Sequence, residues 1–110
     1  MNSLEVIQSA PRCVECGTDR LKPDSIYFGE SLDPRVLKEA ERAALEADIV
    51  FLIGTLGTVD PAAKIPAMAK AHGAVCIEIN PIDTELTYLA DVVIRERGGV
   101  VMKEIINEPI

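Results

Sequence analysis

A loop rich in glycine and threonine follows the most apolar stretch of the chain. The run 49–53 predicts a strand buried on both faces, and a helix is expected to start near Pro61. The loop between them holds four small residues: Gly54, Thr55, Gly57 and Thr58. Ligands bind at the carboxyl ends of strands in open parallel sheets, glycine lets the backbone approach them, and a helix N-terminus favours phosphate. The loop indicates a nucleotide site, although it lacks the full dinucleotide fingerprint and a plain strand-to-helix turn is the alternative.

Two cysteines could bind a metal ion. Cys13 and Cys16 form a C-x-x-C pair followed by Gly17, which suits the tight turn of a zinc knuckle. The third cysteine, Cys76, lies inside an apolar run and is expected to be a packed thiol. Structural zinc needs four ligands, so the missing ones would come from another chain or from solvent. Free thiols are the alternative.

The chain has one histidine, His72, and it is followed by Gly73. A histidine near a helix C-terminus interacts favourably with the helix dipole, and glycine is common just beyond the helix. These two residues are therefore expected to close a helix rather than to catalyse a reaction. Asn80 ends the next strand and is expected to face the same crevice as Gly54.

The elements that must position these residues alternate between strands and helices. Asp33 and Pro34 have the residue types of an N-cap and a first helical residue. Strands are expected at 25–30, 49–53, 74–81 and 91–95, and helices at 34–47, 62–72 with a restart at Pro66, and 100–107 after a break at Gly98 and Gly99. Alternation of this kind predicts an α/β fold with a small parallel sheet.

The charge of the chain excludes some partners. The formal net charge is −7 and the basic residues are not clustered, so nucleic acid and anionic membranes are not expected partners. Apolar runs are too short to span a bilayer, and residues 1–11 lack a signal pattern, so the expected location is cytoplasmic.

An ordered set of short motifs resembles the C-terminal half of the sirtuins, the Sir2-like NAD-dependent protein lysine deacylases. The motifs are Cys13-x-x-Cys16-Gly17, Leu21-Lys22-Pro23-Asp24, Phe28-Gly29-Glu30, Gly54-Thr55, Pro61-Ala62-Ala63, Gly73-Ala74 and Ile79-Asn80. The resemblance covers nearly the whole chain from about Pro11. It implies half of a Rossmann-like, NAD-binding domain at 25–110, preceded at 1–24 by a remnant of the zinc module.

The resemblance also implies roles for individual residues. Gly54, Thr55 and Asn80 would contact NAD, with Leu56 beside them, and Cys13 and Cys16 would be one of the two zinc-binding pairs. The residues implied for the acyl-lysine peptide are Ile26, Phe28, Gly29, Glu30 and Val59.

Departures from the family pattern shape the expected function. Leu56 stands where the family usually has serine, and Asp60 where tyrosine is common. The glycine-rich pyrophosphate loop, the catalytic His-Gly and the first zinc pair are not matched, so a truncated chain without deacylase activity of its own is expected. Two hypotheses follow. The chain is a module that binds NAD or ADP-ribose, as one half of a split deacylase that accepts acylated-lysine peptide only when complemented. Alternatively, it is a structural module that homodimerises through an open sheet edge and the C-x-x-C pair without a cofactor.

Overall fold

The computed structural model describes residues 11–21, 26–27 and 29–107. The chain divides into two compact units, Met1–Leu32 and Asp33–Ile110. Each unit is taken by itself below. In the part of the chain that is described, no helix is long and apolar enough to cross a membrane.

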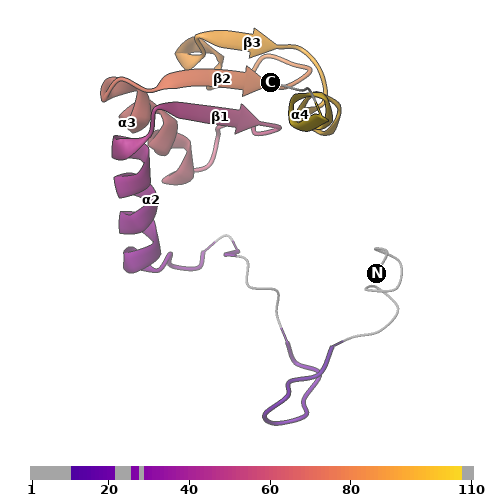
Figure 1. The fold of residues 1–110 in the computed structure, drawn as a ribbon. Helices are drawn as coiled ribbons and strands as arrows, with labels where there is room; N and C mark the ends of the chain where they lie inside the picture. Colours follow the sequence, from indigo (N-terminus) through magenta and orange to yellow (C-terminus); the bar gives the residue numbers. More distant parts are fainter. Residues whose placement is uncertain (1–10, 22–25, 28, 108–110) are drawn as a thin grey trace. The chain divides into compact units, whose positions relative to one another are not determined.

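The second unit is built on a three-stranded parallel sheet (Figure 1). The strands are β1 (Ile49–Ile53), β2 (Val75–Ile79) and β3 (Val92–Ile94), in the order β1-β2-β3. All three consist mainly of β-branched and other large apolar residues, which favour strands. The register pairs Phe51 with Ile77 and Ile77 with Val92, so these three side chains share one sheet face. The α/β fold with a small parallel sheet is confirmed.

Two helices precede and follow β1. Helix α2 (Pro34–Glu46) begins as predicted, because the Asp33 carboxylate accepts the Arg35 backbone N–H at 2.9 Å and Pro34 occupies the first turn. After β1 comes a 3₁₀ turn, η1 (Ala62–Lys64), and then α3 (Ile65–Ala71). The restart predicted at Pro66 is confirmed, since proline fits the first turn of a helix but not its interior.

The C-terminal part contains a second 3₁₀ turn, η2 (Thr87–Leu89), and helix α4 (Gly98–Asn107). The expected break at Gly98 and Gly99 is wrong, because both residues belong to the first turn of α4. A β-carbon on Gly98 would lie 2.4 Å from Ile53 Cγ2. Glycine at this position therefore lets the start of α4 approach the end of β1.

Most of the core lies on one face of the sheet. On that face Leu52 is buried with Leu86 and Leu89, and the cluster of Ala44, Ala69 and Ala74 packs nearby. Small alanines allow α2 and α3 to pack closely. The face is thus covered by α3 and η2, with α2 against α3.

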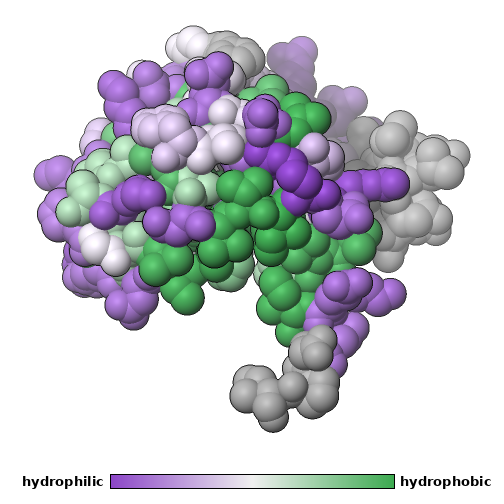
Figure 2. Space-filling view, turned by 90° about the horizontal axis from the view of Figure 1, so that it is seen from above, coloured by the Kyte–Doolittle hydropathy of each residue, from purple (hydrophilic) through white to green (hydrophobic). Residues whose placement is uncertain are grey.

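The opposite face is largely uncovered, and the prediction that β1 is buried on both faces is wrong. We call it the apolar sheet face. It comprises Ile49, Phe51, Ile53, Val75, Ile77, Ile79, Val92 and Ile94, of which Ile79 alone is fully buried. Phe51 is 44% exposed and Val75 is also 44% exposed. Helix α4 approaches this face at the Ile53 end, where Gly98 lies against Ile53. Figure 2 shows that hydrophobic side chains also gather into a contiguous area on the side of the molecule seen there.

The first unit contains a tight turn at the C-x-x-C pair. Gly17 has φ 72° and donates its N–H to the Cys13 carbonyl at 2.9 Å, which is the turn predicted for a knuckle. The strand predicted at 25–30 is wrong for its described residues. Glu30 instead donates its N–H to the Tyr27 carbonyl at 3.0 Å and Gly29 has φ 85°, so this segment turns. A positive φ at Gly29 is incompatible with continued strand geometry.

Candidate nucleotide-binding site

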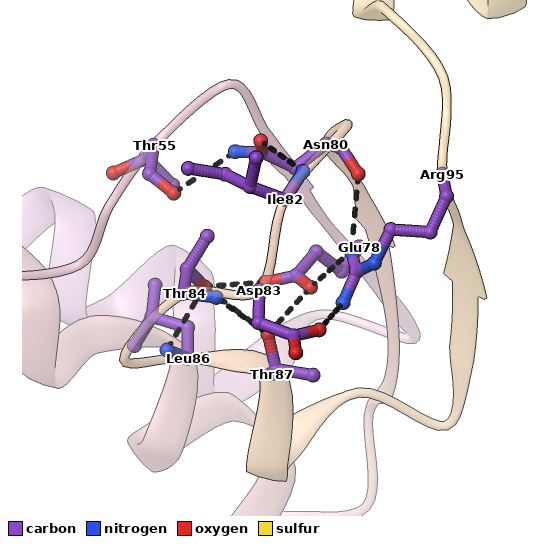
Figure 3. A network of polar contacts seen from close by, with 9 residues as sticks. All are labelled: Thr55, Glu78, Asn80, Ile82, Asp83, Thr84, Leu86, Thr87 and Arg95. Carbon is purple, nitrogen blue, oxygen red and sulfur yellow. Dashed lines mark hydrogen bonds and ion pairs between the residues drawn. The ribbon is translucent and has the colours of Figure 1, made fainter.

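The ends of β1 and β2 lie side by side and bring the predicted loop residues together. The Gly54 N–H donates to the Ile79 carbonyl at 3.1 Å, which extends the parallel ladder to the last residue of β2. The Asn80 Nδ2 donates to the Thr55 carbonyl at 3.3 Å (Figure 3). Asn80 and the loop at Gly54 therefore lie at adjacent strand ends, and their sharing of one binding crevice stays a prediction.

The loop after β1 depends on glycine at two positions. Gly54 has φ 66° and Gly57 has φ 71°, a region that other residues rarely adopt. No atom lies within 4 Å of a β-carbon placed on Gly54, so the backbone there faces open space. At Gly57 such a carbon would meet Leu86 Cγ at 2.3 Å. Gly54 is therefore accessible to a ligand, whereas Gly57 is needed for packing.

A groove of about 720 Å³ adjoins the loop. Its wall includes four consecutive β1 residues, 50–53, whose side chains alternate in direction, so the groove follows the free edge of the strand. It continues along residues 54–59 to the start of η1 and α3. Leu56 and Val59 line it and are both more than half exposed. The groove has the size of sites that hold small molecules.

The Asn80 side chain is 6% exposed and is fixed by two bonds. Besides the bond to Thr55, its Oδ1 accepts the Ile82 N–H at 3.3 Å. An amide has two donor hydrogens and two acceptor lone pairs, so these bonds use one position on each polar atom. The carboxyl ends of β1 and β2 therefore fit the requirements of a nucleotide: exposed loop backbone, a placed amide and an adjoining groove.

A buried carboxylate beneath the site was not predicted. Glu78 is 1% exposed, and its carboxylate accepts hydrogen bonds from Thr84 Oγ1 at 2.6 Å, Thr87 Oγ1 at 2.8 Å and Arg95 Nη1 at 2.9 Å (Figure 3). Burial raises the pKa of Glu78, but these three hydrogen bonds and the Arg95 charge outweigh it, and the pKa lies below its ordinary value. The available signal was a glutamate inside the apolar strand 75–79, because a buried charge requires partners.

The comparisons with known proteins agree with this geometry. A family model described as the Sir2 family matches residues 1–61, more than half of the chain. The NAD-dependent protein deacylase 1 of Archaeoglobus fulgidus is 42% identical over 111 residues, which include 96% of this chain. The chain belongs to the Sir2 family.

Solved Sir2 structures share the fold. A crystal structure of a Sir2 homologue in complex with NAD has a TM-score of 0.74 at 42% identity, and the match covers 91% of this chain and 39% of that one. A Sir2 homologue mutant in complex with ADP ribose also has a TM-score of 0.74 at 42% identity, over 88% of this chain and 39% of that one. The chain spans 45% of the length of the Archaeoglobus deacylase. The match therefore covers less than half of a Sir2 enzyme.

The residues that the Sir2 resemblance implies for peptide binding fall in both units. Val59 lines the groove of the second unit. Ile26, Gly29 and Glu30 are exposed residues of the first unit, and Phe28 lies outside the described residues. Their joint role in peptide binding stays a prediction.

The Sir2 resemblance assigns Cys13 and Cys16 to zinc. The backbone N–H groups of Cys16 and Glu15 hold the pKa of the Cys13 thiol below its ordinary value, which favours the thiolate that a metal requires. Within residues 11–21, 26–27 and 29–107, no group of three or more metal-ligating side chains is found. The pair supplies two of four ligands, so it does not form a zinc site by itself.

His72 closes α3, as predicted. It is the C-cap residue, its Nδ1 lies 3.0 Å from the Met68 carbonyl oxygen, and Gly73 follows with φ 97°. It precedes β2 and therefore lies at the opposite end of that strand from Asn80 (Figure 1). His72 is thus a capping residue remote from the candidate nucleotide-binding site.

Proposed function

We propose that this chain binds the adenosine-diphosphate-ribose part of NAD and forms part of the cofactor site of a Sir2 deacylase. One observation carries the proposal: the loop beginning at Gly54 and the Asn80 amide meet at the tips of adjacent parallel strands. Sir2 homologues of the same fold are seen in complex with NAD and with ADP ribose, which supports the choice of ligand.

Each group in the proposed site has a defined role. The open backbone at Gly54 and the exposed Thr55 would approach the phosphates and the adjoining ribose, because no side chain blocks that approach. The remaining hydrogen-bonding positions of Asn80 would bind a ribose hydroxyl pair. Leu56 would contact the ligand through apolar surface alone. When bound, NAD would supply the ADP-ribose acceptor for the acyl group.

Titration calorimetry with ADP-ribose and with NAD tests the binding. Asn80→Ala should weaken ADP-ribose binding, because it removes the ribose partner and the bond to the Thr55 carbonyl. Asn107→Ala, at the exposed end of α4, is the matched control and should bind like the original chain. Absence of heat and of NMR shift changes at millimolar ADP-ribose would refute the proposal.

The deacylase reaction itself is proposed to require further Sir2 residues. The only histidine in the sequence caps α3, so these 110 residues offer no histidine base near the loop at Gly54. We expect no turnover of an acetyl-lysine peptide with NAD by this chain alone, and turnover after addition of the N-terminal half of the Archaeoglobus relative. Turnover by the chain alone would contradict the need for complementation.

The partner is proposed to cover the apolar sheet face and the free edge of β1. A doubly covered parallel sheet carries helices on both faces, yet Ile49, Phe51 and Val92 are each more than 40% exposed here. The match with the Archaeoglobus deacylase leaves 55% of that protein without a counterpart, since it covers 45% of its length. We propose that a segment equivalent to this remainder is the occupant, bound through apolar contacts and strand pairing.

A second candidate function is favoured by the same free edge. β1 contains no charged residue and no proline, so it lacks the features that prevent edge-to-edge pairing. Two copies pairing through β1 would form a structural homodimer, and two C-x-x-C pairs could then supply four thiolates to zinc. Light scattering with elemental analysis decides between the candidates. A dimer with one zinc per two chains supports the second, and a monomer that binds ADP-ribose excludes it.

A further inference from the structure

The carboxylate of Glu78 organises two hydroxyl groups in the loop after β2. An ionised carboxylate only accepts hydrogen bonds, so the single hydroxyl hydrogens of Thr84 and Thr87 both point at Glu78. Their oxygens are then free to accept backbone N–H groups. Thr84 Oγ1 accepts from Leu86 at 3.1 Å, and Thr87 Oγ1 accepts from Thr84 at 2.8 Å. Glu78 thereby sets the backbone conformation of residues 83–87.

The loop after β2 in turn contacts the loop after β1. The Glu85 N–H donates to the Leu56 carbonyl at 3.1 Å. The Leu86 side chain, which is 4% exposed, occupies the space that only a glycine at position 57 leaves open. The shape of residues 83–87 therefore determines where residues 54–57 can lie.

A second connection from Glu78 reaches Asn80 through Arg95. Arg95 Nη1 donates to Glu78 Oε1 at 2.9 Å and to the Asn80 carbonyl at 3.0 Å, while its Nη2 donates to Asp83 (Figure 3). The guanidinium is rigid and planar, so it holds these groups in a fixed arrangement. Arg95 thus fixes the backbone carbonyl of Asn80, while the Asn80 side chain bonds to the Thr55 carbonyl.

We infer that Glu78 is a positioning residue of the nucleotide-binding site, which fixes Asn80 and the loop 54–57 through Thr84, Thr87 and Arg95. The inference rests on the proposed function, because it assigns Glu78 to the site that would bind ADP-ribose. Glu78 itself is buried, so it would act through its partners and not by contact with the ligand. Its effect is to present the loop backbone and the amide in one arrangement before the ligand arrives.

Glu78→Gln is the sharpest test, because it preserves the size of the side chain. The glutamine NH₂ group replaces one of the two carboxylate oxygens with a donor. If it replaces Oε2, it faces the Thr84 hydroxyl; if it replaces Oε1, it faces both the Thr87 hydroxyl and Arg95. The loop 83–87 then loses its single hydrogen-bonding arrangement. We expect ADP-ribose affinity to fall by about tenfold, equivalent to about 1.4 kcal/mol.

Asp91→Asn is the matched control. Asp91 also holds a strand through its carboxylate, accepting from the Cys76 N–H at 2.9 Å and from Lys70 Nζ at 3.2 Å, but it lies before β3 rather than at the strand tips of the site. We expect Asp91→Asn to leave ADP-ribose affinity within about twofold of the original value. Circular dichroism and thermal unfolding establish that both variants are folded at the temperature of the titration.

NMR of the ligand-free proteins separates this inference from the proposed function. In Glu78→Gln, the amide signals of residues 54–57 should shift or broaden, and the Glu85 N–H should exchange faster with solvent. In Asp91→Asn they should not change. If the original chain does not bind ADP-ribose, the proposed function fails and the NMR comparison still tests positioning. Unchanged loop signals and unchanged affinity in folded Glu78→Gln, or equal losses in both variants, would overturn the inference.

Discussion

Replacing Gly57 with alanine tests the packing of the two loops against each other. Two costs are expected at this position. The backbone has φ 71°, which costs a residue with a β-carbon roughly 1–2 kcal/mol. The new carbon would also lie 2.3 Å from Leu86 Cγ and 2.8 Å from Leu86 Cδ1. Leu86 is buried between Leu52 and Leu89, so it cannot simply rotate away, and overpacking of this kind typically costs about 1–3 kcal/mol.

Two other glycines separate these costs. Gly54 has φ 66° and open space around it, so Gly54→Ala should show the backbone cost alone. A β-carbon on Gly98 would meet Ile53 Cγ2 at 2.4 Å, but Gly98 lacks a positive φ, so Gly98→Ala should show a steric cost alone. Ile53 is 41% exposed and has room to move, which makes that steric cost smaller than at Gly57. Gly57→Ala should therefore be the most destabilising of the three.

The assay is thermal and urea unfolding followed by circular dichroism, since the sequence has no tryptophan for fluorescence. Gly57→Ala should lose roughly 2–5 kcal/mol of unfolding free energy and Gly54→Ala roughly 1–2. A difference of about 1 kcal/mol corresponds to about 4–8 °C in midpoint for a domain of this size. Equal midpoints for Gly57→Ala and Gly54→Ala would refute the claim that Leu86 packs against Gly57.

Three further predictions concern titration, thiol reactivity and the groove. The pKa of Glu78 is lower in the folded chain than its ordinary value of 4.5, so its contribution to stability is complete above that pH and is lost as the pH falls through the folded-state pKa. Acid unfolding should therefore be less steep in Glu78→Gln, and identical acid profiles would contradict this. Cys76 is 0% exposed, and burial raises the pKa of its thiol. A thiol reagent should therefore modify Cys13 and Cys16 rapidly and Cys76 only on unfolding. Cys76→Ser should leave the rapid phase unchanged, whereas rapid modification of all three thiols would contradict the burial of Cys76. Leu56→Ser should increase ADP-ribose affinity about threefold, because it adds a donor at an exposed position of the proposed site; Val59→Ser, on the same groove, should not, and equal changes in both would argue against a specific contact.

The sequence was sufficient to predict the elements whose signals are local. Asp33 and Pro34 mark the start of α2, Pro66 marks the restart before α3, and His72 with Gly73 marks its end, because capping and proline geometry depend on a few neighbouring residues. The meeting of Gly54 with Asn80 was also predictable. It needs only that strands separated by a helix pair in parallel, which places their carboxyl ends at one edge.

Features that depend on distant residues were not predictable. The burial of β1 was overestimated because an apolar run does not reveal which of its two faces another layer will cover. The predicted break at Gly98 was wrong because glycine at this position allows close packing against Ile53. These two residues are 45 positions apart in the sequence. Ile26 and Tyr27 are strand-forming residue types, but they are not in a strand, and Gly29 has a positive φ. In each case a contact or a backbone angle overrode the preference of the residue.

The Glu78 network shows why a candidate site can be recognised before the residues that hold it are known. Gly54, Thr55 and Asn80 can be recognised in the sequence by their residue types and by their place at the ends of predicted strands. Glu78 lies in the same strand as Ile77 and Ile79, and its partners come from 84, 87 and 95, so only the folded chain brings them together. Burying a carboxylate to 1% exposure would cost free energy without those donors. With them, the carboxylate fixes the conformation of the loop 83–87. If the nucleotide site is preformed, it is because this charge lies beneath the strand tips rather than because of the loop glycines alone.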